Sequence, residues 1–449
     1  MLVWVFGDSV LAVLSAQNIV EAFFDNTSLE MMEQIFETEG CLENDAMLRL
    51  CDDQTFLSAL VTSMATNSSD NIAKISVVLE VYMSYITNQT SSNNSATCQM
   101  EKENVHETNS KQLDFLFHKT TEILQNVFLK NYSLAQDHNI VALLQLMLLL
   151  LKYSQSAYTI SVKILYHVMN VLSKKEKRRQ DLEKACMLTV LAAVTSDSKT
   201  QSQSSICAVV VQHDGFMSYI QSCLDRTQDD IMYCITCDLL VVFIQQKSLK
   251  CDSGVQIDIG KIVNSVSTDS GDFMVASINL LSALFSVNMT SAVVKVMGRI
   301  YPVIYRSLYI QLQQSCLQEG TDTAYSAVAC LRNLILYLYQ SDKDTGDELL
   351  SQPWNIVLLE TVLDLAFSGD VKEHHLVLLS MFTELETGCT LIKSTSNLLD
   401  KLMHFMQLTS KDADKTFKEH YITLLKQLRT NFADALSEEN MKWLNENEA

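Results

Sequence analysis

Apolar residues recur at helical spacing along most of the chain, and four stretches repeat one arrangement of them. Each stretch has an apolar amphipathic run, a short polar turn with an aspartate, and a second apolar run. A leucine follows the aspartate at the same distance in all four, and the pairs are Asp70 and Leu79, Asp230 and Leu239, Asp272 and Leu281, and Asp370 and Leu379. A recurring helix–turn–helix unit predicts a solenoid, in which each unit buries its apolar face against its neighbours.

The same periodicity predicts helices over most of the chain, with short polar segments between them. The expected helices span 8–24, 28–37, 42–51, 53–66, 70–88, 111–131, 137–152, 156–173, 179–195, 203–211, 214–224, 229–246, 256–267, 271–287, 290–298, 300–318, 322–340, 354–368, 371–387, 396–408, 412–430 and 437–446. We expect the turn aspartates to cap the helices that follow, because a side-chain oxygen there can accept the free amides of a first turn.

One segment breaks this pattern. Residues 87–110, TNQTSSNNSATCQMEKENVHETNS, contain few apolar side chains and cannot repay the entropy of ordering. The sequence therefore predicts N-terminal helical repeats over 1–86, a disordered linker or loop over 87–110, and a continuous armadillo-like helical array over 111–449.

Composition supports an all-α chain. Glycine and proline together number 13 of 449 residues (11 plus 2), about 3%, against about 12% in an average protein. Sheet proteins with many tight turns depend on these residues. At 449 residues, the chain also exceeds what one compact core usually supports, so either two or three domains or an elongated array is expected.

The helix–turn–helix junctions resemble those of armadillo and HEAT repeats, and Asp230 and Asp272 lie one such unit apart. The resemblance implies a right-handed α-solenoid with degenerate repeats that serves as a non-catalytic scaffold for protein–protein interaction. Importin-type arrays repeat Trp-x-x-x-Asn along their groove. This chain matches that pattern once, at Trp443 and Asn447, which argues against a nuclear-import receptor.

The stretch WNIVLLETVLDLAFSGDVKEHHLVLLSMFTEL and the acidic, Ser/Asn-rich composition also resemble the family of meiosis inhibitor protein 1. This resemblance implies a role in meiotic chromosome processes, namely double-strand-break formation and synapsis. The alternative is a cytoplasmic or centrosomal armadillo adaptor.

The net charge is −20, with 53 acidic against 33 basic residues. Such a surface repels phosphate, so we expect no direct nucleic-acid binding, and protein partners with basic, helical or extended segments. The longest uncharged apolar run, 140–151, is too short for the about 20 residues that cross a bilayer, so no membrane association is expected. The oligomeric state stays open.

The twelve cysteines lie mostly in apolar helical runs, as reduced thiols do. Residues 2–16 resemble a signal peptide but lack a basic start, and Asp8 interrupts them. We therefore expect a nuclear or cytoplasmic protein that is not secreted.

Gly7-Asp8-Ser9 resembles the nucleophile block of GDSL hydrolases, which also use an Asp-x-x-His near the C-terminus. No histidine in this chain has an aspartate three residues before it. We therefore expect Asp8 or Ser9 to cap a helix and the chain not to be an enzyme. A GDSL-like hydrolase that uses Ser9 is the remaining catalytic alternative. No phosphate-binding glycine motif is present, and no cofactor is expected.

Two further groups suggest metal chemistry. Cys234 and Cys237, with Cys223 and Cys251 on either side, have the number of thiolates of a zinc site, but their mid-helix position favours a core stripe. His374-His375 lack the spacing of a zinc motif, which favours a solvated helix start.

One basic cluster stands out in this acidic chain. It lies in a turn between expected helices and consists of Lys174, Lys175, Lys177, Arg178 and Arg179. Such a cluster is typical of a nuclear-import signal or of a docking site for acidic groups. A solvated inter-helix loop is the alternative interpretation.

Overall fold

The structure is a computed structural model, and it describes residues 51, 54–65, 69–92, 99–129, 137–153, 160–174, 179–197, 206–225, 230–249, 255–268, 271–287, 294–295, 300–317, 321–368, 371–409 and 415–447. The chain forms two compact units that meet in sequence between Cys223 and Leu224. The three-part division expected from the sequence stays a prediction.

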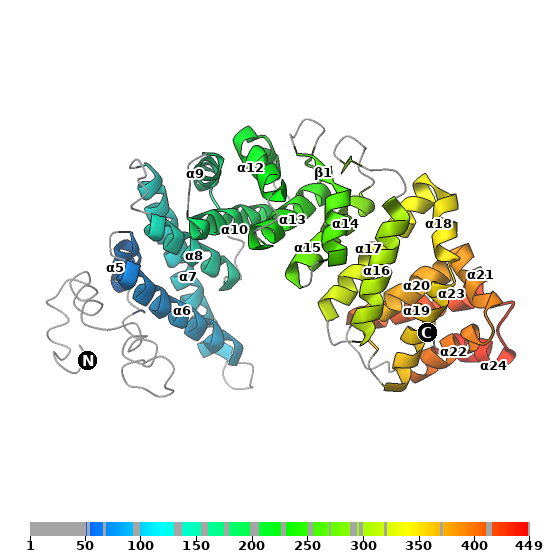
Figure 1. Cartoon of the computed structure of the whole chain (residues 1–449). Coiled ribbons are helices and arrows are strands. Elements are labelled where there is room, and N and C mark those ends of the chain that lie inside the picture. Colours follow the sequence, from blue (N-terminus) through cyan, green and yellow to red (C-terminus); the bar gives the residue numbers. More distant parts are fainter. Residues whose placement is uncertain are drawn as a thin grey trace. The chain divides into compact units, whose positions relative to one another are not determined.

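The helices of the first unit, labelled as in Figure 1, are α5 (Gln54–Met64), α6 (Ser69–Ser92), α7 (Gln99–Leu129), α8 (Asp137–Tyr153), α9 (Val162–Ser173), α10 (Gln180–Asp197), α11 (Ile206–Val211) and α12 (Asp214–Asp225), whose last residues pass into the second unit. The second unit contains α13 (Asp230–Gln245), β1 (Ile257–Asp258), α14 (Ile259–Thr268), α15 (Asp272–Ser286), β2 (Val294–Lys295), α16 (Ile300–Leu317), α17 (Thr321–Ser341), α18 (Lys343–Leu350), α19 (Trp354–Ser368), α20 (Glu373–Glu384), α21 (Glu386–Ser394), α22 (Leu398–Leu408), α23 (Lys415–Asn431) and α24 (Glu438–Asn447).

Helix α9 shows how the sequence specifies these elements. Ser161 caps its N-terminus, and the Ser161 side chain accepts a hydrogen bond from the Ile164 amide at 3.4 Å. Its buried side chains follow helical spacing and are Ile164, Leu165, Val168, Met169, Val171 and Leu172. A capped start and one apolar stripe thus give a helix that must pack against neighbours.

The second unit has two layers of helices. One layer runs α13, α15, α17, α20, α23, and each of these helices packs on the next. The other layer runs α14, α16, α19, α22 in the same manner. Helix pairs α14–α15 and α16–α17 join the layers (Figure 1). Helix α20 has apolar and polar side chains buried on all sides, because α17, α21 and α23 all pack against it.

The first unit repeats this plan. Helices α6, α8 and α10 form one layer, α5, α7 and α9 form the other, and the pairs α5–α6, α7–α8 and α9–α10 connect them. Each helix therefore buries its apolar stripe against neighbours in its own repeat and in the next one, as a solenoid requires.

Side-chain hydrogen bonds cross from one repeat to the next. In the second unit, Gln311 reaches the Val266 carbonyl 45 residues away and Asn333 reaches Ser282 51 residues away. In the first unit, Gln125 reaches Ser161 36 residues away. These separations lie on either side of the length of one armadillo or HEAT unit, which is about 40–47 residues. The chain is an all-α solenoid with armadillo/HEAT-like repeats, which confirms the fold class expected from the sequence.

The expectation that the turn aspartates cap the following helices is wrong for Asp272. Asp272 is the first residue of α15, while Gly271 takes the N-cap position with φ +71°, and no side chain caps this helix. Glycine adopts that backbone conformation without strain, and the Asp272 charge acts instead on the positive end of the helix. The side chains of Asp70 and Asp230, and the whole of Asp370, lie outside the described residues.

Three local expectations differ from the structure. Residues 294–295, expected within a helix, form β2, which pairs in parallel with β1, since the valine-rich SAVVKV favours extended backbone. Short helices α18 and α21 occur where the sequence predicts connections. Within the expected linker, residues 87–92 extend α6 and residues 99–110 begin α7.

In the described part of the chain, no helix has the length and apolar character needed to cross a membrane.

Candidate protein-binding surface

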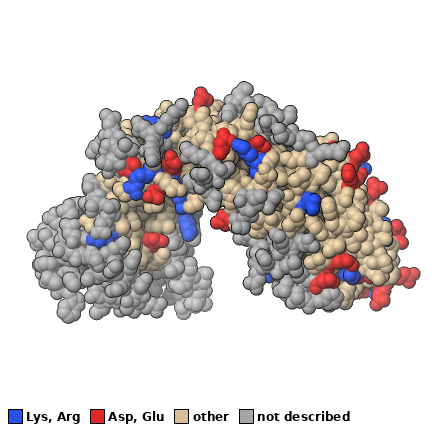
Figure 2. All heavy atoms as spheres, viewed as in Figure 1, with Lys and Arg blue, Asp and Glu red and all other residues tan. Residues whose placement is uncertain are grey.

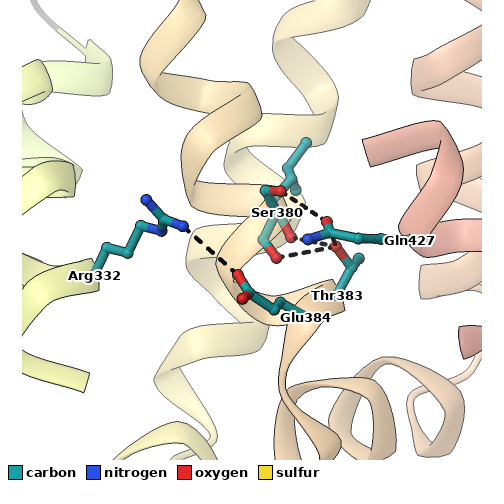
Figure 3. A network of polar contacts seen from close by, with 6 residues as sticks. Arg332, Ser380, Thr383, Glu384 and Gln427 are labelled. Carbon is teal, nitrogen blue, oxygen red and sulfur yellow. Dashed lines mark hydrogen bonds and ion pairs between the residues drawn. The ribbon is translucent and has the colours of Figure 1, made fainter. Parts of the chain in front are cut away.

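Three successive helices of one layer, α17, α20 and α23, meet along a line of polar side chains that we call the polar seam (Figure 3). Its members are Arg332 on α17, Ser380, Thr383 and Glu384 on α20, and Gln427 and Asn431 on α23. Helix α20 lies between the other two. The polar seam thus spans three consecutive repeats.

Gln427 is the centre of the polar seam. Its Oε1 atom lies 2.7 Å from the Ser380 hydroxyl and 2.8 Å from the Thr383 hydroxyl, and it accepts from both. Asn431 donates from Nδ2 to the Thr383 carbonyl at 2.8 Å. Ser380 and Thr383 are buried and lie one turn apart on the same face, so their hydroxyls need hydrogen-bond partners. The Thr383 hydroxyl also lies 3.1 Å from the Leu379 and Ser380 carbonyls of its own helix, whereas Ser380 relies on Gln427.

An exposed ion pair lies on the other side of α20. Arg332 and Glu384 are 3.7 Å apart, and each side chain is 43% exposed. An exposed pair contributes about 0–1 kcal/mol to stability, so its charges remain able to interact with a partner. Near the start of α20, His420 of α23 lies 3.1 Å from Glu373. Polar contacts between α20 and α23 therefore occur near both the start and the end of α20.

The polar seam has the chemistry of a structural and recognition surface. Ser380 contacts an amide oxygen, which is too weak a base to activate a serine hydroxyl as a nucleophile. What the arrangement can do is hold three helices in register and expose Arg332 and Glu384 beside one another. A partner that lies across these helices would contact side chains from more than one repeat.

The prediction that His374 and His375 form a solvated helix start is wrong. Both side chains are buried, at 6% and 4% exposed. The Lys372 amide donates to Nδ1 of His375 at 3.0 Å, so His375 caps the first turn of α20. Burial, reinforced by nearby positive charge, lowers the pKa of His374 to about 4 and that of His375 to about 3. Both rings are therefore neutral at physiological pH.

The basic cluster lies where α9 ends and α10 begins. Lys174 is the C-cap residue of α9, and Arg179, which is exposed, directly precedes α10. The Arg179 guanidinium lies 3.2 Å from a carboxylate oxygen of Asp181 and also contacts the imidazole ring of His138 on α8. Its other members, Lys175, Lys177 and Arg178, lie outside the described residues. The import or docking role stays a prediction.

Among the described residues, the other candidates from the sequence do not form a cluster of reactive or metal-binding side chains. On α13, Cys237 is buried and Cys234 half-buried, and burial raises the pKa of the Cys237 thiol, so it stays protonated. Cys251 and Ser9 lie outside the described residues. Across the residues that the structure describes, no three His, Cys, Asp or Glu side chains gather to hold a metal ion. In α24, Asn447 donates to the Trp443 carbonyl at 2.7 Å, within its own helix.

Sequence reasoning missed the polar seam, although a signal was present. Ser380 and Thr383 interrupt the apolar residues of α20 one turn apart, and Gln427 and Asn431 do so on α23. Polar residues at i, i+3 and i+4 on two packed helices indicate hydrogen bonding between them. The sequence alone does not say which helices pack together, so these two signals could not be joined.

Comparisons with known proteins show sequence similarity over a short part of the chain. No protein-family model matches the chain. Over 93 residues the chain is 29% identical to meiosis inhibitor protein 1 of Mus musculus, a match that covers 21% of this chain and 7% of the mouse protein. The weak resemblance expected from the sequence is thereby confirmed over that short stretch.

Three solved structures align over most of this chain at low sequence identity. An engineered protein has a TM-score of 0.48 at 12% identity, covering 95% of this chain and 97% of its own. A structure from work on a phosphorylation switch in the cadherin–β-catenin interaction has a TM-score of 0.45 at 11% identity, covering 98% and 97%. A structure described as Uso1-2 has a TM-score of 0.36 at 11% identity, covering 99% and 82%.

Proposed function

We propose that the chain is a non-catalytic scaffold that binds other proteins along surfaces assembled from successive repeats. One observation carries this proposal: helices α13, α15, α17, α20 and α23 follow one another in a single layer, each packed on the next. Side chains from different repeats then form one continuous surface, and the polar seam is its clearest example. Extended surfaces of this kind are what α-solenoids use for recognition.

The charge of the chain indicates the kind of partner. Acidic side chains gather over α18, α21 and α24 on the face shown in Figure 2, and the net charge is −20. Partners with basic, helical or extended segments complement such a surface, and their binding should weaken as salt rises. Direct binding to nucleic acid is disfavoured for the same reason.

The biological setting that we propose is meiosis. The match to mouse meiosis inhibitor protein 1 supports this setting, together with the residues that carry the family resemblance. A nuclear location fits this role, and the cluster Lys174–Arg179 would then act as an import signal. Alanine at all five cationic positions of this cluster should shift a fluorescent fusion from nucleus to cytoplasm, and an unchanged distribution would exclude the import role.

Affinity purification from meiotic germ cells tests the scaffold directly. The epitope-tagged chain should recover the same proteins in repeated experiments, and their yield should fall as salt is raised. The matched control is a chain that is unfolded by heat before mixing, which should lose these proteins. If the folded chain recovers nothing beyond what the heated chain recovers, the scaffold proposal is wrong. Recovery of centrosomal proteins from dividing somatic cells would favour the adaptor alternative.

A further inference from the structure

Arg306 on α16 differs from the other arginines that the structure describes. Arg179, Arg332 and Arg429 each have an interaction partner. Arg306 is exposed, and no hydrogen-bond or ion-pair partner of its guanidinium is found within the described chain. Acidic residues outnumber basic ones 53 to 33 in the sequence, so an unpaired arginine is not explained by a shortage of carboxylates.

Exposed apolar side chains flank Arg306. Val303 and Ile310 are 53% and 40% exposed, and with Arg306 they occupy positions i, i+3 and i+7 of α16. Such positions lie on one helix face and span about 10 Å. On the adjacent helix α19, Val357 is 49% exposed.

Two hydrogen bonds, one buried and one half-buried, fix α19 beside this part of α16. The Tyr305 hydroxyl donates to Asn355 Oδ1 at 2.7 Å, and the Tyr309 hydroxyl donates to the Trp354 carbonyl at 3.1 Å. Tyr305 directly precedes Arg306, and Tyr309 directly precedes Ile310. The outward faces of the two helices therefore adjoin. We call Val303, Arg306, Ile310 and Val357 the Arg306 patch.

Exposure of valine and isoleucine side chains to water is unfavourable, and a partner that covered them would remove this unfavourable contact. Arginine is one of the residues that are enriched in interaction hot spots. The i, i+3, i+7 spacing on a helix fits a second helix that lies alongside with apolar residues at the same spacing. The Arg306 guanidinium lies between Val303 and Ile310, and a carboxylate of the second helix that faced it would form an ion pair with it.

We propose that the Arg306 patch binds an amphipathic α-helix of a partner protein, which buries its apolar face on Val303, Ile310 and Val357 and places a glutamate or aspartate against Arg306. This inference rests on the proposed scaffold function and names one of its binding surfaces. It places that surface on the layer that contains α16 and α19, and not on the polar seam of the other layer.

A charge-swap experiment with the full chain tests this proposal. The probe is a fluorescein-labelled synthetic helix of about 18 residues, or about five turns, with leucines along one face, a central glutamate on that face and lysines on the other. A second peptide carries lysine in place of the central glutamate. Fluorescence anisotropy should show that the wild-type chain prefers the glutamate peptide by about ten-fold. Arg306→Glu should reverse this preference, and Val303→Asp should weaken the binding of both peptides.

Lys343→Glu on α18 is the matched control, because Lys343 is also exposed and the charge change is the same. It should leave both affinities unchanged, and helical circular dichroism should be equal for all variants. Equal binding of the two peptides to wild type, or no effect of Arg306→Glu, would overturn the proposal. Dimerisation of the wild type that Val303→Asp abolishes would also overturn it, since the patch would then contact a second copy. Partners recovered from germ cells equally by wild type and by Arg306→Glu would leave the scaffold function in place and remove only this surface.

Discussion

Replacing Asn355 with alanine should destabilise the second unit more than any change of a surface residue. Asn355 is fully buried, and its side chain joins three elements. Its Oδ1 accepts from the Tyr305 hydroxyl of α16 at 2.7 Å, and its Nδ2 donates to the carbonyls of Leu349 and Leu350, at the end of α18, each at 2.9 Å. Asn355 itself belongs to α19.

The magnitude follows from the groups that would lose their partner. Alanine at 355 would leave the fully buried Tyr305 hydroxyl and the Leu350 carbonyl without this partner, whereas the Leu349 carbonyl keeps its bond from the Gln352 amide at 3.4 Å. An unpaired buried polar group costs about 1–3 kcal/mol, so we expect a total loss of about 3–5 kcal/mol after partial relaxation. Tyr305→Phe removes only one of the three bonds and should cost about 1–2 kcal/mol. The effects of the two variants should not add, because they share one bond.

Hydrogen exchange measured by mass spectrometry is the suitable assay, because a chain of two units need not unfold in one step. Amides of α16, α18 and α19 should exchange roughly 100-fold faster in Asn355→Ala, which corresponds to about 3 kcal/mol. Gln352→Ala is the control, since the Gln352 side chain lies in the connection between α18 and α19 and donates to the Glu348 carbonyl of α18 in an exposed hydrogen bond. If both variants change exchange equally, or Asn355→Ala by less than about five-fold (about 1 kcal/mol), Asn355 does not join these elements.

Three other changes test further parts of the structure. The folded pKa values of about 4 for His374 and about 3 for His375 lie below the unfolded value of 6.5, so the unfolded state binds more protons and stability falls as pH drops below about 6.5. The loss of stability at pH 5 should be about 2 kcal/mol for each histidine. In denaturant unfolding, the double variant His374→Leu/His375→Gln should show a much shallower dependence of stability on pH. The same dependence on pH as in the wild type would contradict this reasoning. Gln427→Ala should cost about 1–2 kcal/mol in urea unfolding, because the buried Ser380 hydroxyl would lose its acceptor while the Thr383 hydroxyl keeps carbonyls of α20. No change would mean that water replaces the Gln427 oxygen. Gly388→Ala should lower the melting temperature by several degrees, because the added Cβ would collide with the Phe382 carbonyl, whereas Gly260→Ala, whose Cβ would meet only a carboxylate side chain, should not; equal melting temperatures would contradict this contact.

The repeat pattern was predictable because apolar spacing alone defines a helix pair. The sequence predicts helices over 229–246 and 271–287, and the structure has α13 at Asp230–Gln245 and α15 at Asp272–Ser286. Each of these helices has enough apolar residues on one side for its period to be read without knowledge of its neighbours.

Burial that neighbouring repeats impose could not be predicted in this way. His374 and His375 follow a charged residue at a helix start, which is typical of a solvated position, yet α17, α21 and α23 enclose α20. Helices α18 and α21 escaped prediction because they are short and rich in polar residues, and α18 depends on contacts such as those of Asn355. The polar seam depends on which helices pack together, and no single helix contains that information.

Zero-length cross-linking tests the central claim, that neighbouring repeats stack side by side at a fixed sequence separation. A carbodiimide joins a lysine to a carboxylate only where the two groups touch. The structure predicts cross-links between Lys401 and Glu360, which are 2.8 Å apart, and between Lys393 and Asp434, which are 2.7 Å apart, each pair separated by 41 residues. Mass spectrometry should find both in the monomeric chain. Their absence, with cross-links instead between acids and lysines many repeats apart, would show a compact fold and contradict the solenoid.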